Sequence, residues 1–203
     1  MKIDFKAGEI SFDRQEFEID VFTLKFIRHL NAIGIRYVLI SGYVAIVFGR
    51  SRNTEDVDII VEKMEFEKFA SLWESLKDEY ECMNAVDPKS AYFEYLENQT
   101  PIRFHYRGKF IPNVEFKFPK NRWDQYSLDN KLRLSLNGKP LFISPLEMQI
   151  AFKGYLNSEK DIEDARFLYQ VFQKHLDNAK LAFFFREFAV KPKDVRKITG
   201  DLG

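Results

Sequence analysis

Two aspartates, Asp56 and Asp58, are the residues of this sequence that are best placed for chemistry. They begin the run 56–61 (DVDIIV), whose apolar, β-branched character predicts a strand. Residues two apart on a strand point to the same side, so the two carboxylates share one side of the predicted sheet. Neighbouring carboxylates repel each other, and a divalent metal between them would offset that repulsion. The alternative is a solvated strand face, which the apolar Ile60 on the same side disfavours.

The segment ahead of this strand is suited to phosphate. Residues 36–40 (RYVLI) predict a buried strand, Ser41-Gly42 interrupts it, and residues 43–48 can form a short helix. Backbone N–H groups at the start of a helix favour an anion. Arg50 and Arg52 follow in a loop, and arginine binds phosphate oxygens in a bidentate fork. Ser41, Gly42, Arg50 and Arg52 are therefore candidate nucleotide-binding residues, with ordinary loop arginines as the alternative for the last two.

The order of these segments resembles the nucleotidyltransferase superfamily of the DNA polymerase β type. The shared pattern is a hydrophobic strand, a small-residue turn and then alternating aspartates, here Asp56 and Asp58. The sequences of residues 40–43 (ISGY) and 49–58 (GRSRNTEDVD) look most like the minimal prokaryotic branch that includes the AbiEii-type toxins. Ser41 stands where that turn usually carries glycine, the residue that lets backbone approach phosphate closely.

The resemblance implies transfer of a nucleoside monophosphate from an NTP to a hydroxyl, with release of pyrophosphate. Asp56 and Asp58 would bind two Mg²⁺ (or Mn²⁺) ions. The superfamily uses a third carboxylate on a neighbouring strand, and Glu115 in residues 114–116 (VEF) matches that pattern. Glu115 would complete the metal site and help to deprotonate the attacking hydroxyl. The alternatives are an edge-strand glutamate paired with Lys117, or Glu94 in the third carboxylate's place.

A lysine near the C-terminus is the remaining candidate. Residues 144–147 (SPLE) are a strong helix start, and Lys153 falls on the apolar stripe of that helix. By resemblance Lys153 would contact nucleotide phosphate, and we expect it to point into the cleft over the two aspartates. Lys160-Asp161 also matches a Lys-Asp motif of the family, although Ser158 and Asp161 form a capping box by themselves. The roles of Asp161 and Asp164 stay open.

Composition restricts the protein class. The chain has 203 residues, 45% hydrophobic, which excludes a disordered polymer, and its 31 basic residues equal its 31 acidic ones. There is thus no overall basic excess that would indicate nucleic-acid binding. A single cysteine, Cys82, cannot form an internal disulfide, so we expect a reducing cytoplasmic location. No apolar run approaches the ~18 residues of a membrane helix, so no membrane is expected.

The expected architecture is an α/β (α+β) fold, a small mixed sheet of nucleotidyltransferase type followed by a C-terminal helical region. We place the α/β core at residues 1–143 and the helical region, packed on it, at 144–203. Helical spacing predicts helices at 19–33 and 64–76, and alternation predicts strands at 102–106 and 114–118. Further expectations are an edge strand or arm at 3–12, a strand near 80–83, a short helix at 90–96, a hairpin at 132–143 around Asn137-Gly138, helices through 144–190 and a basic tail at 191–197.

The acceptor is not specified by the sequence. It could be an RNA end such as that of tRNA, a protein side chain or a small molecule such as an aminoglycoside. Two other functions remain: a catalytically degenerate protein that binds nucleotide or RNA, and a member of a toxin–antitoxin pair with a cognate partner. The serine at position 41 favours the degenerate alternative.

Overall fold

The computed structural model describes residues 3–6 and 9–200. The chain forms two compact units. The sheet unit contains the described residues of 1–43 and 53–143, and the helical unit contains those of 44–52 and 144–200. The helical unit includes residues 44–52, with the arginine loop, which the sequence analysis placed in the α/β core.

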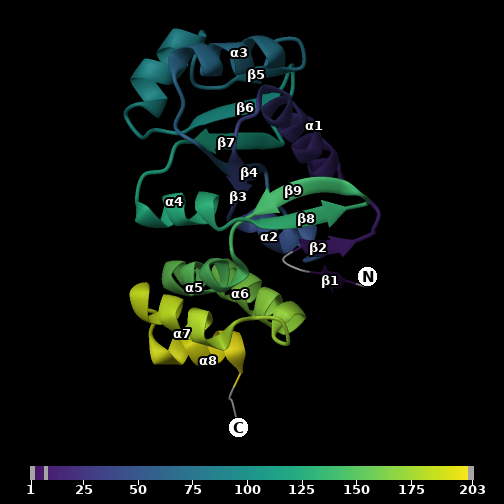
Figure 1. Cartoon of the computed structure of the whole chain (residues 1–203), viewed down its shortest axis with the longest axis vertical. Coiled ribbons are helices and arrows are strands. Elements are labelled where there is room, and N and C mark those ends of the chain that lie inside the picture. Colours follow the sequence, from purple (N-terminus) through teal and green to yellow (C-terminus); the bar gives the residue numbers. More distant parts are fainter. Residues whose placement is uncertain (1–2, 7–8, 201–203) are drawn as a thin grey trace. The chain divides into compact units, whose positions relative to one another are not determined.

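A single mixed sheet dominates the sheet unit (Figure 1). Within the described residues nine strands lie in the order β1-β2-β8-β9-β3-β4-β7-β6-β5. Three neighbouring pairs, β2 with β8, β3 with β9 and β4 with β7, are parallel, and the others are antiparallel. The strands are β1 (Asp4–Lys6), β2 (Glu9–Phe12), β3 (Tyr37–Leu39), β4 (Asp56–Val61), β5 (Tyr80–Cys82), β6 (Ile102–Tyr106), β7 (Asn113–Lys117), β8 (Leu132–Leu136) and β9 (Lys139–Ile143).

One face of the sheet is covered by two amphipathic helices, α1 (Glu18–Ile33) and α3 (Phe66–Leu76). Aromatic rings carry the packing: Phe26 of α1 and Trp73 of α3 contact Phe104 on β6, and Phe69 contacts Phe116 on β7. Phe116 lies opposite Ile59 of β4, so this is the side to which the apolar residues of β4 point. Burial of this layer is the main stabilising contribution to the unit.

The other face of β4 carries the aspartates. Strand β4 is central, and its burial alternates at the start, with Asp56 and Asp58 half-buried and Val57 fully buried. Further along the same face, Ile60 is buried against Leu128 of α4 (Arg122–Asp129). The predicted placement of both aspartates on one side of a central strand is therefore confirmed, and the dry environment of Ile60 excludes a wholly solvated face.

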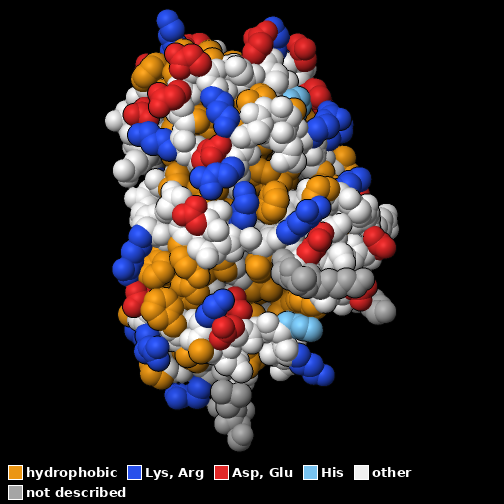
Figure 2. All heavy atoms as spheres, in the orientation of Figure 1, with side chains coloured by type: hydrophobic (Ala, Val, Ile, Leu, Met, Phe, Trp, Pro, Cys, Tyr) orange, Lys and Arg blue, Asp and Glu red, His pale blue; other side chains and the backbone are white. Residues whose placement is uncertain are grey.

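The helical unit consists of α5 (Leu146–Leu156), α6 (Glu159–Phe172), α7 (Asn178–Glu187) and α8 (Pro192–Thr199), together with the end of α2 (Gly42–Val47) and the loop after it. Gly154 allows close packing of α5, since a Cβ there would lie 2.9 Å from a methyl group of Ile198 in α8. Figure 2 shows hydrophobic side chains gathered over these helices, and the exposed ones include Phe152, Tyr155, Leu156 and Phe183. Among the described residues, no helix has the length and hydropathy that crossing a membrane requires.

Most predicted elements are present, and three differ. The expected short helix at 90–96 is a π-helix, η1 (Ser90–Leu96). Helix α4 was not predicted: it begins where the side chain of Asn121 accepts hydrogen bonds from two backbone N–H groups. The predicted basic tail is in fact helix α8, with Pro192 in its first turn. Residues 7–8 of the predicted arm lie outside the described residues, and the parts on either side of them form β1 and β2.

Candidate active site

Asp58 and Glu115 lie directly opposite each other on neighbouring strands. Strand β4 pairs with β7 in parallel, and in this register Asp58 is the partner of Glu115. Across the next pair Glu115 lies opposite Arg103 of β6. Since directly opposed residues share a face, Asp58, Glu115 and Arg103 form a polar row across three strands. The prediction that Glu115 lies on a strand adjacent to the aspartates is confirmed, and the strand is an interior one rather than an edge.

The turn at Ser41 supports Asp58. Ser41 has a φ of 62°, the left-handed conformation that glycine adopts without cost. The main-chain N–H of Ile40 donates to the carbonyl of Asp58, and the hydroxyl of Ser41 hydrogen-bonds the Asp58 carboxylate. The turn therefore faces the aspartate strand, as predicted. The serine keeps the backbone conformation of the expected glycine and adds a polar contact.

Asp56 has a different neighbour. The hydroxyl of Thr54 lies 3.1 Å from Oδ1 of Asp56, and it is also 3.1 Å from the main-chain oxygen of the same residue. Thr54 therefore fixes the start of β4 and the direction of the first carboxylate. Because the side chain of Asp56 is only half-buried, it is open to a ligand from the solvent side.

Two cations of the sheet unit hold Glu115. Nζ of Lys117 is 2.9 Å from Oε1 of Glu115 and 3.4 Å from Oδ1 of Asp58. The guanidinium of Arg103 is 2.7 Å from the other oxygen, Oε2, of Glu115. Lys117 thus lies between Asp58 and Glu115, whereas the sequence led us to expect a cation between Asp56 and Asp58. Pairing of Glu115 with Lys117 alone was the alternative considered from the sequence; neither the contact with Asp58 nor that with Arg103 was anticipated.

These contacts separate the acidities of the two opposed carboxyls. Burial raises the pKa of Asp58, and the charges of Glu115 and Asp56 raise it further, against the opposing effect of Lys117. Burial also acts to raise the pKa of Glu115, but Lys117 and Arg103 outweigh it and leave that pKa lowered. Negative charge is consequently less stable at Asp58 than at Glu115.

The donors suit a hard divalent cation in their chemistry. Asp56, Asp58 and Glu115 offer carboxylate oxygens on one face of two adjacent strands, the ligand type that Mg²⁺ and Mn²⁺ prefer. Among the described residues, no group of three or more His, Cys, Asp or Glu side chains is placed so that it could hold one metal ion. Glu115 is instead engaged by Lys117 and Arg103. The residues therefore fit the ion in type and strand position, with Glu115 held by the protein's own cations.

The helical unit contains a second charged cluster, centred on Asp164 of α6. Its carboxylate is fully buried and accepts from Nε of Arg50 at 2.5 Å, from Nζ of Lys153 at 2.7 Å and from the guanidinium of Arg52. Lys153 is likewise buried, with 1% of its surface exposed, and is 3.4 Å from Asp161. The predicted burial of Lys153 is confirmed, and the structure supplies Asp164 as its main partner. That Lys153 faces the aspartates of the sheet stays a prediction.

Asp161 has a local structural role as well. Its backbone N–H bonds the hydroxyl of Ser158, so the predicted cap of α6 is present. Arg50 has a further partner in Glu163, 2.6 Å away. Asp164, whose role the sequence left open, is the residue that joins the arginine loop to α5 and α6. The position of Asp164 one helical turn after Asp161 was the one feature of the sequence that pointed to it.

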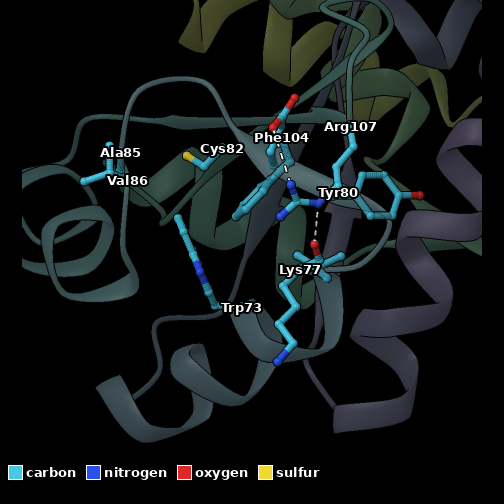
Figure 3. A pocket seen from close by; sticks show the side chains of 10 residues that line it. Trp73, Lys77, Tyr80, Cys82, Ala85, Val86, Phe104 and Arg107 are labelled. Atoms are coloured by element: carbon cyan, nitrogen blue, oxygen red, sulfur yellow. Dashed lines mark hydrogen bonds and ion pairs between the residues drawn. The ribbon is translucent and has the colours of Figure 1, made fainter.

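A pocket in the sheet unit lies away from the polar row. It has a volume of roughly 280 Å³ and lies between α3 and the strands β5 and β6. Figure 3 shows Trp73 and Phe104 beside this space and Arg107 reaching toward Lys77, whose carbonyl accepts its Nε–H at 2.6 Å. Phe104 belongs to the face that α1 and α3 cover. None of the predicted site residues lines this pocket.

Comparisons with known proteins support the fold. The sequence matches no protein-family model, and no curated protein matches it closely enough to be a recognised relative. Among solved structures, it is similar to an antigenic nucleotidyltransferase-like protein from Paracoccidioides brasiliensis, with a TM-score of 0.57 and 18% identity over 90% of this chain and 92% of that one. It is also similar to ANT(2'')-Ia in complex with adenylyl-2''-tobramycin, with a TM-score of 0.56 and 13% identity over 85% and 98%.

At these identities the similarity is one of fold. The chain has the mixed α/β fold of nucleotidyltransferase-like proteins, as predicted from the alternating aspartates and the turn before them. The comparisons do not point to the AbiEii-like branch in particular.

Proposed function

We propose that this protein is a metal-dependent nucleotidyltransferase that moves a nucleoside monophosphate from an NTP to a hydroxyl. The observation that carries the proposal is the row formed by Asp58 and Glu115 on the central parallel strand pair, with Asp56 beside it. This arrangement occurs within a fold shared with nucleotidyltransferase-like proteins. Two oxygen donors on one strand and a third on its neighbour suit phosphoryl-transfer chemistry.

The chain's own residues then have distinct roles. Asp56 and Asp58 hold Mg²⁺ or Mn²⁺, which supplies Lewis acidity and charge neutralisation at the reacting phosphate. Glu115 accepts the proton of the attacking hydroxyl, whose oxygen forms the new bond to the α-phosphorus while the bond to pyrophosphate breaks. Lys117 and Arg103 hold the pKa of Glu115 below its usual range, so it is ionised at neutral pH but is a weaker base than an unpaired glutamate. Ser41 orients Asp58 through its hydroxyl.

Phosphate contacts are proposed at two places. In the sheet unit the main chain at Ser41 and Gly42 is one, by resemblance to the family turn. In the helical unit the candidates are Arg50, Arg52 and Lys153, all three of which contact Asp164. A triphosphate bound by them competes with Asp164, and also with Glu163 and Asp161, which pair with Arg50 and Lys153.

The acceptor proposed here is a hydroxyl on a small molecule, an RNA or a protein. A structure with the same fold was solved with an adenylylated aminoglycoside, which supports the small-molecule class. The exposed apolar side chains of α5 and α7 (Phe152, Tyr155, Leu156 and Phe183) form the kind of surface that protein partners cover. A protein acceptor or the cognate partner of a toxin–antitoxin pair would use such a surface.

One observation favours the degenerate alternative, in which nucleotide binds without turnover. Lys117 and Arg103 already neutralise Glu115, which an enzyme would need as a base. A protein that binds nucleotide but never releases pyrophosphate is the outcome this alternative predicts.

The test uses NTPs labelled at the α-phosphate, incubated with Mg²⁺ and, in separate reactions, total RNA, cell lysate or an aminoglycoside. A labelled acceptor together with released pyrophosphate supports transfer. Glu115→Gln should lower the rate by at least about 100-fold, the size of a lost general base. Glu94→Gln is the matched control, because Glu94 is exposed and should leave the rate unchanged. Nucleotide binding without label transfer in any reaction would identify the degenerate protein.

A further inference from the structure

Lys117 lies in an unusual place for a lysine. It follows Glu115 by two residues on β7, so both side chains point to the same face as Asp58. Its ammonium bridges the two carboxylates, 2.9 Å from Glu115 and 3.4 Å from Asp58. The three side chains are similarly enclosed, with 15% to 18% of each exposed. The ammonium therefore occupies the space between Oδ1 of Asp58 and Oε1 of Glu115.

The charges of the polar row and of its neighbours Asp56 and Lys117 nearly balance one another. Asp56, Asp58 and Glu115 contribute three negative charges, and Lys117 and Arg103 contribute two positive ones. Arg103 contacts Oε2 of Glu115, and among the described residues Lys117 is the cation that forms ion pairs with both Asp58 and Glu115. A divalent ion added beside Lys117 would convert the remaining negative charge into a positive one and would lie next to a like charge.

We propose that Lys117 is a built-in counter-ion that competes with the divalent cation for Asp58 and Glu115 and must move aside before the ion binds. The inference rests on the proposed function, because it takes the divalent cation as the ligand of these carboxylates. The flexible four-carbon stem of lysine allows the ammonium to leave while the strand stays in place. Lys117 thereby lowers the affinity of Asp58 and Glu115 for the divalent cation. The affinity rises when another group binds the ammonium of Lys117.

A direct metal-binding measurement tests this. Mn²⁺ is titrated into the protein without nucleotide, and free Mn²⁺ is followed by electron paramagnetic resonance. Lys117→Met keeps most of the side-chain stem and removes the charge. This variant should bind Mn²⁺ at least about tenfold more tightly than the unaltered protein, because it removes the repulsion between the ammonium and the ion. Lys117→Gln is a second neutral variant in case the first does not fold, as judged by circular dichroism.

Two controls isolate the effect. Lys117→Arg keeps the positive charge and should retain the weak binding of the unaltered protein. Lys63→Met makes the same change in net charge at an exposed lysine that pairs with Glu97, and should shift the Mn²⁺ affinity by less than about twofold. Adding Asp58→Asn to Lys117→Met should abolish the gain, because the ion then loses one of the two carboxylates.

The outcomes separate this inference from the proposed function. Tighter binding in both neutral variants and not in Lys117→Arg supports the counter-ion role. Equal affinities for the unaltered protein and folded neutral variants, with weaker binding in Asp58→Asn, would overturn the role of Lys117 and leave the metal site standing. Failure of every variant to bind Mn²⁺ at millimolar concentration would overturn both.

Discussion

Replacement of Asp164 by asparagine is expected to be among the most damaging single changes in the helical unit. The Asp164 carboxylate is fully buried, and it contacts Arg50, Arg52 and Lys153. Asparagine fills the same volume but carries no charge and replaces one acceptor oxygen by a donor group. The substitution therefore leaves the three cations facing a neutral amide.

The size of the loss follows from what each cation retains. Arg50 keeps Glu163, which is more than half exposed, and Lys153 keeps Asp161 at 3.4 Å. Arg52 forms no other ion pair among the described residues. Removing one partner of a buried ion pair costs about 3–5 kcal/mol. For a chain of this size each kcal/mol corresponds to roughly 2–4 °C, so the midpoint of thermal unfolding should fall by about 6–20 °C.

Urea unfolding measures this loss. Far-UV circular dichroism follows the helices, whereas Trp73 and Trp123 both belong to the sheet unit and report on it by fluorescence. Glu163→Gln is the matched control and should cost at most about 1 kcal/mol, because the side chain of Glu163 is largely exposed. If Asp164→Asn unfolds within 1 kcal/mol of that control, the cations do not depend on Asp164 and the reasoning fails.

Three smaller perturbations test other parts of the chain. Ser41→Gly should be more stable than Ser41→Ala by about 1 kcal/mol, the reverse of the usual order, because the φ of 62° strains any residue with a Cβ; equal thermal midpoints would contradict this. Although burial acts to raise the pKa of Glu62, its hydrogen bond with Arg36 and further contacts lower it to about 2. A depressed carboxyl pKa stabilises the fold above the unfolded value of 4.5, and that contribution disappears as the pH falls towards 2, so Glu62→Gln should destabilise at neutral pH and much less in acid. Unfolding free energies that differ equally at both pH values would refute the linkage. Tyr43→Phe should cost about 1 kcal/mol in urea unfolding, because it removes one 2.8 Å hydrogen bond to the buried Asp20, and a loss no larger than the error would show that this bond contributes nothing.

Local patterns accounted for much of the fold. Helix α1 shows regular apolar spacing over 16 residues and ends at Gly34 in a left-handed conformation, and the hairpin of β8 and β9 turns at Asn137-Gly138 as its sequence predicts. Helix α4 was missed because it is short and polar and buries little besides Ser127 and Leu128. Such a helix carries almost no periodic signal, and its cap at Asn121 was the only cue.

The sequence predicted which residues of the site share a strand face, but not the contacts that depend on the register between strands. Alternation placed Asp56 with Asp58 and gave Glu115 a strand of its own. The position of Arg103 opposite Glu115 depends on how β6 pairs with β7, which no local pattern determines. The contacts of Asp164 join residues 112 and 114 positions away in the chain, so spacing along the sequence gives no indication of them.

The charges of the polar row are unevenly satisfied, and this unevenness has a consequence for function. Glu115 has a cation on each of its oxygens and a lowered pKa, whereas Asp58 shares one ammonium at 3.4 Å and has a raised pKa. A bound cation would therefore stabilise the carboxylate of Asp58 more than that of Glu115. Asp58 is also the residue that the Ser41 hydroxyl hydrogen-bonds. A raised carboxyl pKa means that the charged form of Asp58 destabilises the fold at neutral pH, and a neutral side chain of similar size removes that cost. Asp58→Asn should accordingly raise the free energy of unfolding in urea at neutral pH, and a lower value would show that the charge of Asp58 contributes to the fold.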